Sequence, residues 1–131
     1  MAGSAVVTMD KIDINGQNQR KVINIAWTGA SNDGTMPAVV LDSATYGIQG
    51  WYLYSCITNP GTTAPTDDYD ITVTDSDGND LAEGALADRD EANTEIVRLS
   101  GHVILGDLSV NITNNSVHSA VGVIKLILTA N

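Results

Sequence analysis

The sequence has one cysteine and no phenylalanine in 131 positions, and the shortage of cysteine already narrows the class of protein. One cysteine cannot close a disulfide within the chain, so the fold must be held by its core. Cys56 lies in the apolar run 51–57, which favours a buried thiol over a nucleophile. A chain of this length fits one domain and can be stable without disulfides or a structural metal.

Basic residues are also few. Six Lys and Arg stand against sixteen Asp and Glu, which gives a net charge of −10. A phosphate backbone repels such a chain, and the basic residues are scattered, with only Arg20 and Lys21 adjacent. We therefore expect no binding of nucleic acid. The acidity favours solubility and could steer the protein toward a basic protein surface.

Long apolar runs are missing as well. The longest, 121–128, is interrupted by Lys125 and is too short to span a bilayer as a helix. Residues 1–5 carry no positive charge and no apolar stretch of the length that a secretory signal needs. The sequence predicts a protein that is used without Sec-type export and has no part in a membrane.

Groups for catalysis and metal binding are equally sparse. The two histidines, His102 and His118, have no nucleophile motif beside them and no second ligand at zinc spacing, so we expect both on the surface. No glycine-rich loop for phosphate is present. Carboxylates are abundant at 67–70 and 88–91, but in so acidic a chain they do not indicate catalytic pairs. We predict no enzymatic activity and no cofactor.

The run 75–80 (DSDGND) places oxygen ligands at alternate positions, as calcium sites do. Counted from Asp75, the register puts Asp80 where an EF-hand loop needs glycine and Leu86 where it needs glutamate. The favoured interpretation is a turn whose Asp and Asn side chains bind their own backbone. A calcium site outside the EF-hand pattern is the alternative.

The sequence does show apolar and polar residues that alternate with a period of two. Its β-branched and aromatic residues are concentrated in short runs between turn signals. Runs end at Asn15-Gly16 and Asp77-Gly78, pairs that tolerate the positive φ of tight reversals. The pattern predicts one all-β domain, 1–131, folded as a two-layer β-sandwich of jelly-roll or immunoglobulin-like topology with eight or nine short strands. The expected strands are 6–14, 20–28, 36–42, 50–58, 69–74, 94–99, 102–105, 107–113 and 120–129.

Burial can also be predicted from the pattern. The segments 36–42 and 50–58 are apolar on both faces, which is typical of buried central strands. Trp27 and Trp51 lie in apolar strand patterns, so we expect them in the core rather than on a sugar-binding platform. The stretch 79–93 allows one short helical turn at most.

Three segments carry a family resemblance: 50–54 (GWYLY), 60–75 (PGTTAPTDDYDITVTD) and 112–126 (ITNNSVHSAVGVIKL). Together they resemble small β-rich virion proteins of tailed bacteriophages, and they look most like capsid decoration, or cement, proteins. The similarity covers residues 50–126 best and the first fifty residues poorly.

The resemblance implies a structural protein on the outer surface of an icosahedral phage capsid, made in the cytoplasm of a bacterial host. It would act as a homotrimer that bridges subunits of the major capsid protein and stabilises the assembled shell by mass action. The alternatives are a phage tail, connector or fibre component, including a glycan-binding adhesin module. An adhesin would expose Trp27, Trp51 or a tyrosine beside carboxylates, whereas a hydrolase would bring a histidine to a nucleophile.

Two regions are candidates for the interface with a partner. Residues 1–9 are predicted to form an interface arm or strand, because small apolar residues near a chain end need a neighbour to hold them. Its expected anchors are Val6, Val7 and Met9. The apolar surface around Trp51 and Tyr54 is the second candidate.

Overall fold

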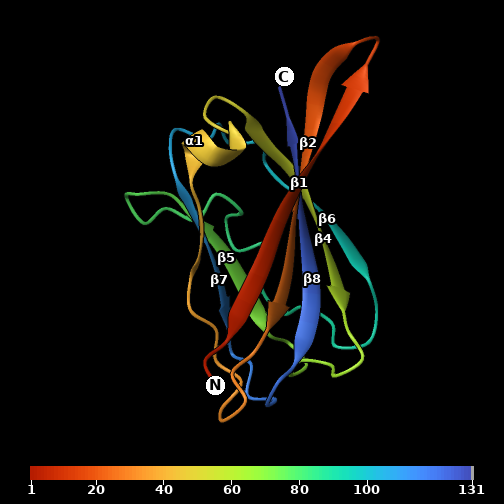
Figure 1. Cartoon of the computed structure of the whole chain (residues 1–131), viewed down its shortest axis with the longest axis vertical. Coiled ribbons are helices and arrows are strands. Elements are labelled where there is room, and N and C mark those ends of the chain that lie inside the picture. The colour runs from red at the N-terminus through yellow and green to blue at the C-terminus, as the bar shows by residue number, and fades with distance from the viewer. Residues whose placement is uncertain (131) are drawn as a thin grey trace.

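The structure, a computed structural model, describes residues 1–130, without the side chains of Ile14 and Asn18. Eight strands and one short helix make up its regular elements (Figure 1). They are β1 (Ser4–Ile14), β2 (Gln17–Thr28), β3 (Val39–Leu41), α1 (Ser43–Tyr46), β4 (Tyr52–Pro60), β5 (Asp70–Thr74), β6 (Glu95–Arg98), β7 (Leu108–Thr113) and β8 (Val121–Thr129).

The strands form two antiparallel sheets that pack face to face. One sheet has five strands in the order β1-β2-β8-β4-β6, and the other has three in the order β3-β7-β5. A single cluster of buried apolar side chains fills the space between them. The predicted all-β sandwich and its expected number of strands are confirmed.

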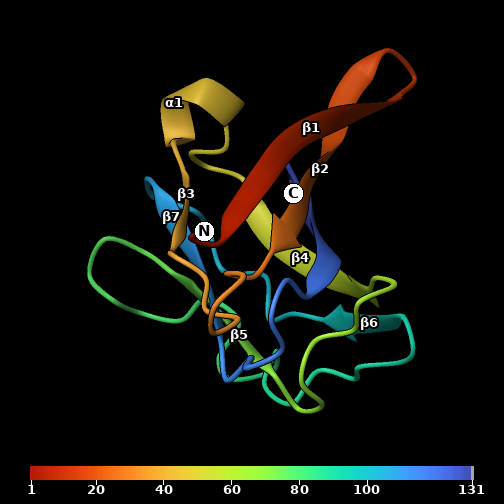
Figure 2. The same cartoon turned by 60° about the horizontal axis from the view of Figure 1, so that its bottom comes forward.

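The reversal at Asn15-Gly16 is confirmed too. Ile14 pairs with Gln17, and the two residues between them have φ of 54° and 77°, as a tight hairpin turn requires. The tip of this β1–β2 hairpin projects beyond the rest of the chain in both views (Figures 1 and 2).

Strand β2 shows how alternation builds the core. Ile23, Ile25 and Trp27 point into the sandwich and are almost completely buried. Lys21 has the same parity and is buried as well, which lowers the pKa of its amine. Its Nζ donates hydrogen bonds to the carbonyl oxygens of Tyr46, at 3.0 Å, and of Gly47, at 2.7 Å. The cation thereby binds the last carbonyl groups of α1.

Of the two segments that are apolar on both faces, 50–58 has the predicted central position but not the predicted burial, since Tyr52 is 37 % exposed and Tyr54 and Ile57 are only half-buried. Strand β4 lies between β8 and β6, as expected of a central strand. The segment 36–42 was predicted wrongly: only β3 forms there, at the edge of the three-stranded sheet, and Val40 on its outward face is 62 % exposed. No third layer of the described chain covers that face, so apolar character on both sides did not mean burial.

Two further details differ from the prediction. The segment 102–105 forms a single bridge, between Val103 and Tyr52, instead of a strand, and Gly101 with φ of 81° turns the chain just before it. A short helix that was not predicted forms at α1, where Asp42 accepts a hydrogen bond from the Thr45 amide at 3.0 Å. The segment 79–93 has turns and two isolated bridges and no helix, within the limit of one helical turn that was predicted. No helix within residues 1–130 is long and apolar enough to cross a membrane.

The chain itself holds its first residues, contrary to the expectation that they need a neighbouring subunit. The Met1 amine donates to Ser31 Oγ at 2.7 Å, and the Ser31 amide donates to the Met1 carbonyl at 3.0 Å. Ser4 then starts the ladder to β2, opposite Thr28. The order of residues 1–5 is therefore no sign of a partner.

Gly122 allows a close contact with Trp27 in the core and gives a test of the packing. A Cβ at this position would lie 2.9 Å from Nε1 of Trp27, whose ring cannot move away because it is buried against Tyr69. We predict that Gly122→Ala lowers the free energy of unfolding by about 1–3 kcal/mol, measured by chemical denaturation.

Gly106→Ala is the matched control, since a Cβ there meets nothing within 4 Å. It should change the free energy of unfolding by less than about 0.5 kcal/mol. Equal stability of the two variants would contradict the contact between β8 and Trp27.

Candidate binding surface

The outward face of the five-stranded sheet is not covered by any other strand of the described chain. Residues of one parity point into the core, and those of the other parity point away from it and remain mostly exposed or half-exposed. Hydrogen-bonded register brings these outward side chains into rows across the strands.

One half of this face is mostly apolar, with the exposed Lys125 of β8 lying opposite Ile57 within it. Ala26 of β2 lies opposite Val6 of β1 on one side and Val123 of β8 on the other, and Ile57 of β4 lies opposite Ile96 of β6. Val6 is 68 % exposed and Ile96 is 74 % exposed. Val6, Ala26 and Val123 also line a shallow open hollow. We call these five residues the apolar half of the face. Exposed large apolar side chains grouped in this way mark interaction sites.

The other half carries positive charge around one aromatic ring. The guanidinium carbon of Arg98 lies 4.7 Å from the centre of the Tyr54 ring, and that of Arg20 lies 5.7 Å from it. Arg20 also donates to Thr129 Oγ1 at 2.6 Å. The β-bulge between Leu53 and Ser55 places Tyr54 between the two arginines. We call Arg20, Tyr54 and Arg98 the basic cluster.

The charges of the chain are divided between this sheet and the rest. The strands of the five-stranded sheet hold five of the six basic residues but only three of the sixteen acidic ones. The remaining basic residue, Arg89, is buried. The surface outside the five-stranded sheet is therefore strongly acidic, while the sheet itself is slightly basic.

The predicted interface residues do not form one surface. Val6 lies in the apolar half, and Tyr54 lies in the basic cluster. Val7 and Met9 have the opposite parity on β1 and pack, half-buried, against the core. Trp51 is also half-buried against the core. Of the five, only Val6 and Tyr54 thus belong to the outward face.

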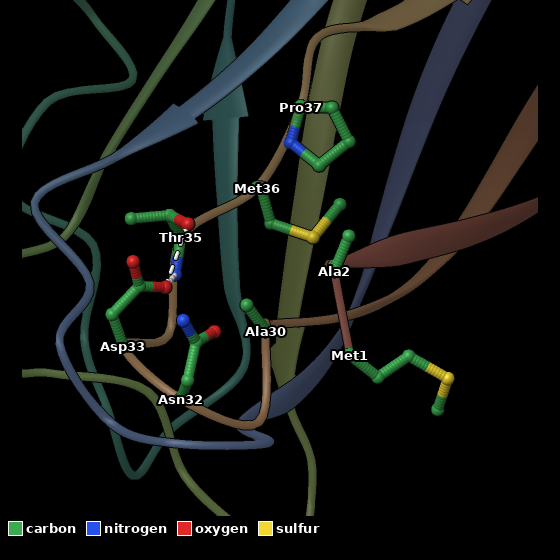
Figure 3. Close-up of a pocket in the computed structure, with 9 residues that line it drawn as sticks. Met1, Ala2, Ala30, Asn32, Asp33, Thr35, Met36 and Pro37 are labelled. Atoms are coloured by element: carbon green, nitrogen blue, oxygen red, sulfur yellow. Dashed lines mark hydrogen bonds between the residues drawn. The ribbon is translucent and has the colours of Figure 1, made fainter.

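A pocket beside the N-terminus contains few groups for chemistry (Figure 3). Met1, Ala2, Met36 and Pro37 give it a largely apolar wall, as Figure 3 shows. The carboxylate of Asp33 is its only charged side chain. It accepts hydrogen bonds from the Thr35 amide at 3.0 Å and from Thr35 Oγ1 at 2.7 Å, which lower its pKa. The carboxylate thus stabilises its own turn.

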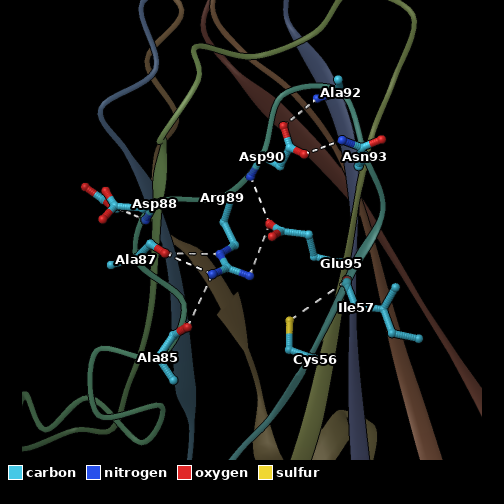
Figure 4. Close-up of polar contacts among 11 residues, drawn as sticks. Cys56, Ile57, Ala85, Ala87, Asp88, Arg89, Asp90, Ala92, Asn93 and Glu95 are labelled. Atoms are coloured by element: carbon cyan, nitrogen blue, oxygen red, sulfur yellow. Dashed lines mark hydrogen bonds and ion pairs between the residues drawn. The ribbon is translucent and has the colours of Figure 1, made fainter.

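Arg89 holds the loop 85–95 against the sheet (Figure 4). Its Nη2 donates to the Ala87 carbonyl at 3.0 Å, and its Nη1 lies 3.4 Å from Glu95 Oε1. The same Glu95 oxygen accepts a hydrogen bond from the Asp90 amide at 2.9 Å. This buried arginine satisfies backbone carbonyls of the loop, and its contacts are structural.

Both histidines lie on the surface, as predicted. His102 Nε2 lies 3.0 Å from Glu83 Oε2, and this contact lowers the pKa of the Glu83 carboxyl. The Ser100 side chain also hydrogen-bonds the Glu83 carboxylate and lowers its pKa further, whereas the thiol, Cys56, is buried elsewhere.

The run 75–80 forms the predicted turn. Asp75 Oδ1 accepts hydrogen bonds from the amides of Asp77, at 3.0 Å, and Asn79, at 2.9 Å, so its side chain binds the local backbone. In the described part of the chain, no three His, Cys, Asp or Glu side chains lie so that they could hold a metal ion.

Comparison with known proteins adds no relative. No protein-family model matches the chain, and no curated protein matches it.

The burial of the Cys56 thiol can be tested by its reactivity. Burial raises the pKa of Cys56 to about 12, so almost no thiolate exists at neutral pH. The folded protein should react with Ellman's reagent on the order of 1,000-fold more slowly than the protein unfolded in guanidinium chloride. Stoichiometric labelling of the folded protein within minutes would contradict this burial.

Proposed function

We propose that this protein is a structural virion protein that decorates the outside of an icosahedral phage capsid as a homotrimer. It stabilises the shell by bridging subunits of the major capsid protein. The observation that carries the proposal is the exposed apolar half of the five-stranded sheet, which suits a protein partner. The resemblance of residues 50–126 to capsid decoration proteins supplies the identity of that partner.

The geometry of the face suits tight binding to protein. Its side chains stand on paired strands, so little backbone entropy is lost when a partner covers them. Burying an exposed Val or Ile side chain contributes about 1.5–3 kcal/mol, and Val6 and Ile96 are both largely exposed. A shallow face without a deep pocket fits another protein surface better than it fits a small molecule.

The stabilising effect follows from differential binding. A subunit that binds only where neighbouring capsid proteins meet stabilises the assembled shell relative to its dissociated parts. At a free concentration of a hundred times Kd, each bound site contributes about 2.7 kcal/mol. This mechanism needs shape and apolar contacts, and it requires no catalytic group.

The burial of the tryptophans favours this proposal over a glycan-binding adhesin. Trp27, which an adhesin would expose, is 1 % exposed. Trp51 is half-buried beneath the Lys21 amine, which lies 4.6 Å from its ring centre. Neither indole is placed as an open stacking platform for sugar.

Charge placed in the apolar half should weaken binding to capsids. We expect Val6→Glu combined with Ile96→Glu to reduce the affinity for DNA-emptied capsids by about 10- to 100-fold, because two carboxylates would lose their hydration in the contact. Co-sedimentation with the capsids measures the affinity.

Val40→Glu is the control, since Val40 is 62 % exposed on the outward face of the other sheet. It should bind as the unmodified protein does. If Val40→Glu abolishes binding while the double variant binds normally, the three-stranded sheet is the binding face and our assignment is wrong.

The oligomeric state is a separate prediction. Light scattering of the purified protein should give three times the chain mass of 13.8 kDa, because a capsid offers local threefold positions. A monomer both in solution and on the particle would refute the trimer.

A further inference from the structure

A cyclic homotrimer needs two different patches on every chain. Each contact in such a ring joins one patch of a subunit to another patch of the next subunit, so the two patches must complement each other. A contact between identical patches would give a dimer instead. The trimer of the proposed function therefore requires a complementary pair of surfaces within this one sequence.

The basic cluster is the first of these two surfaces, because no described acidic side chain forms an ion pair with it. Arg20 and Arg98 flank the Tyr54 ring, yet no described carboxylate side chain lies within ion-pair distance of either guanidinium. In a chain with sixteen acidic residues, two adjacent arginines without an acidic partner are unexpected. Contact with the ring limits the motion of the guanidinium groups and leaves N–H donors for carboxylates.

The loops 67–70 and 88–90 form the complementary surface. The Asp68 amide donates to the Arg89 carbonyl at 3.0 Å, and the Asp88 amide donates to Asp70 Oδ1 at 2.8 Å, so the two loops lie together. Charge repulsion is visible here: the pKa of Asp68 lies above its usual range, chiefly because of the neighbouring charge of Asp67. The other carboxylates that raise it are Asp88, Asp70 and Asp90.

These loops have little positive charge of their own to balance them. Arg89 is the basic residue within them, and its side chain turns inward to Ala87 and Glu95 (Figure 4). Asn114 donates one hydrogen bond to Asp70, which satisfies an oxygen but adds no charge. An external cation would therefore relieve the repulsion among the carboxylates.

The two surfaces form no ion pair with each other within the described chain. Tyr54 stands near the start of β4, and the loop that leads to Asp67 follows its end at Pro60. Tyr54 and Pro60 are about 20 Å apart along β4 at the usual rise per residue, whereas Arg98 lies about 10 Å along β6 from Glu95, whose carboxylate accepts a hydrogen bond from the Asp90 amide. Each surface is therefore open to an oppositely charged surface of another molecule.

We propose that the basic cluster of one subunit binds the acidic loops 67–70 and 88–90 of a second copy, and that this head-to-tail contact builds the trimer. The inference rests on the trimeric state of the proposed function. Arginine forks bind carboxylates through two parallel hydrogen bonds, which fixes orientation as well as affinity. Val6, Ala26 and Val123, which form a row six residues along β2 from Arg20, stay free for the capsid.

Charge reversal and its rescue test the contact. Arg98→Glu and Asp67→Lys should each shift the trimer toward monomers, with the trimer-to-monomer midpoint at least about 10-fold higher in sedimentation velocity. The combined variant Arg98→Glu/Asp67→Lys has the original net charge and should recover most of the trimer. Because the contact is ionic, 500 mM NaCl should weaken the unmodified trimer.

Two variants control for net charge alone. Lys11→Glu alters an exposed basic residue of the same sheet, and Asp77→Lys alters an exposed carboxylate of another turn, so both should leave the trimer intact. The contact is overturned if the unmodified protein is monomeric, if Arg98→Glu remains trimeric, or if Lys11→Glu dissociates it equally. Loss of capsid binding by an intact trimer would count against the proposed function and not against this contact.

Discussion

The single apolar layer between two sheets of unequal width is the constraint on which the rest of the molecule depends. Trp27 fits into this layer only because Gly122 has no side chain and Tyr69 packs beside the indole, with ring centres 5.8 Å apart. Only one face of each strand can contact this layer, so every second side chain points outward. Where those residues are apolar, as Val6 and Ile96 are, the chain is left with a surface that it cannot bury itself.

That uncovered face and the separation of charge together suggest a protein that works by contact. The five strands hold most of the basic groups, and two of these, Arg20 and Arg98, flank Tyr54, while the loops at 67–70 and 88–90 collect carboxylates near the end of β4. Our proposals assign a different partner to each part: a capsid to the apolar half, and a second copy to the basic cluster. Neither proposal needs a cofactor or a reactive side chain.

Local patterns predicted much of the fold, whereas the surface depended on tertiary arrangement. The Asn15-Gly16 turn and the buried parity of β2 follow from neighbouring residues alone, and both are confirmed. The burial of segment 36–42 was predicted wrongly, because apolar residues on both faces indicate burial only if a layer covers each face. Sequence reasoning therefore missed Ile57 and Ile96 as surface residues, although the apolar outward parity of 50–58 was a usable signal. The position of Arg98 beside Tyr54 depends on the β4–β6 register and a bulge, which no single strand encodes.

The central claim is that the outward face of the five-stranded sheet is the surface that meets the capsid. A cryo-electron microscopy reconstruction of decorated particles tests it most directly, because the two sheets are distinguishable by strand number. We predict that the five-stranded sheet faces the shell, with Val6, Ala26 and Ile96 within contact distance of capsid protein. A reconstruction in which the three-stranded sheet and Val40 face the shell, with β2 and β8 open to solvent, would contradict the claim.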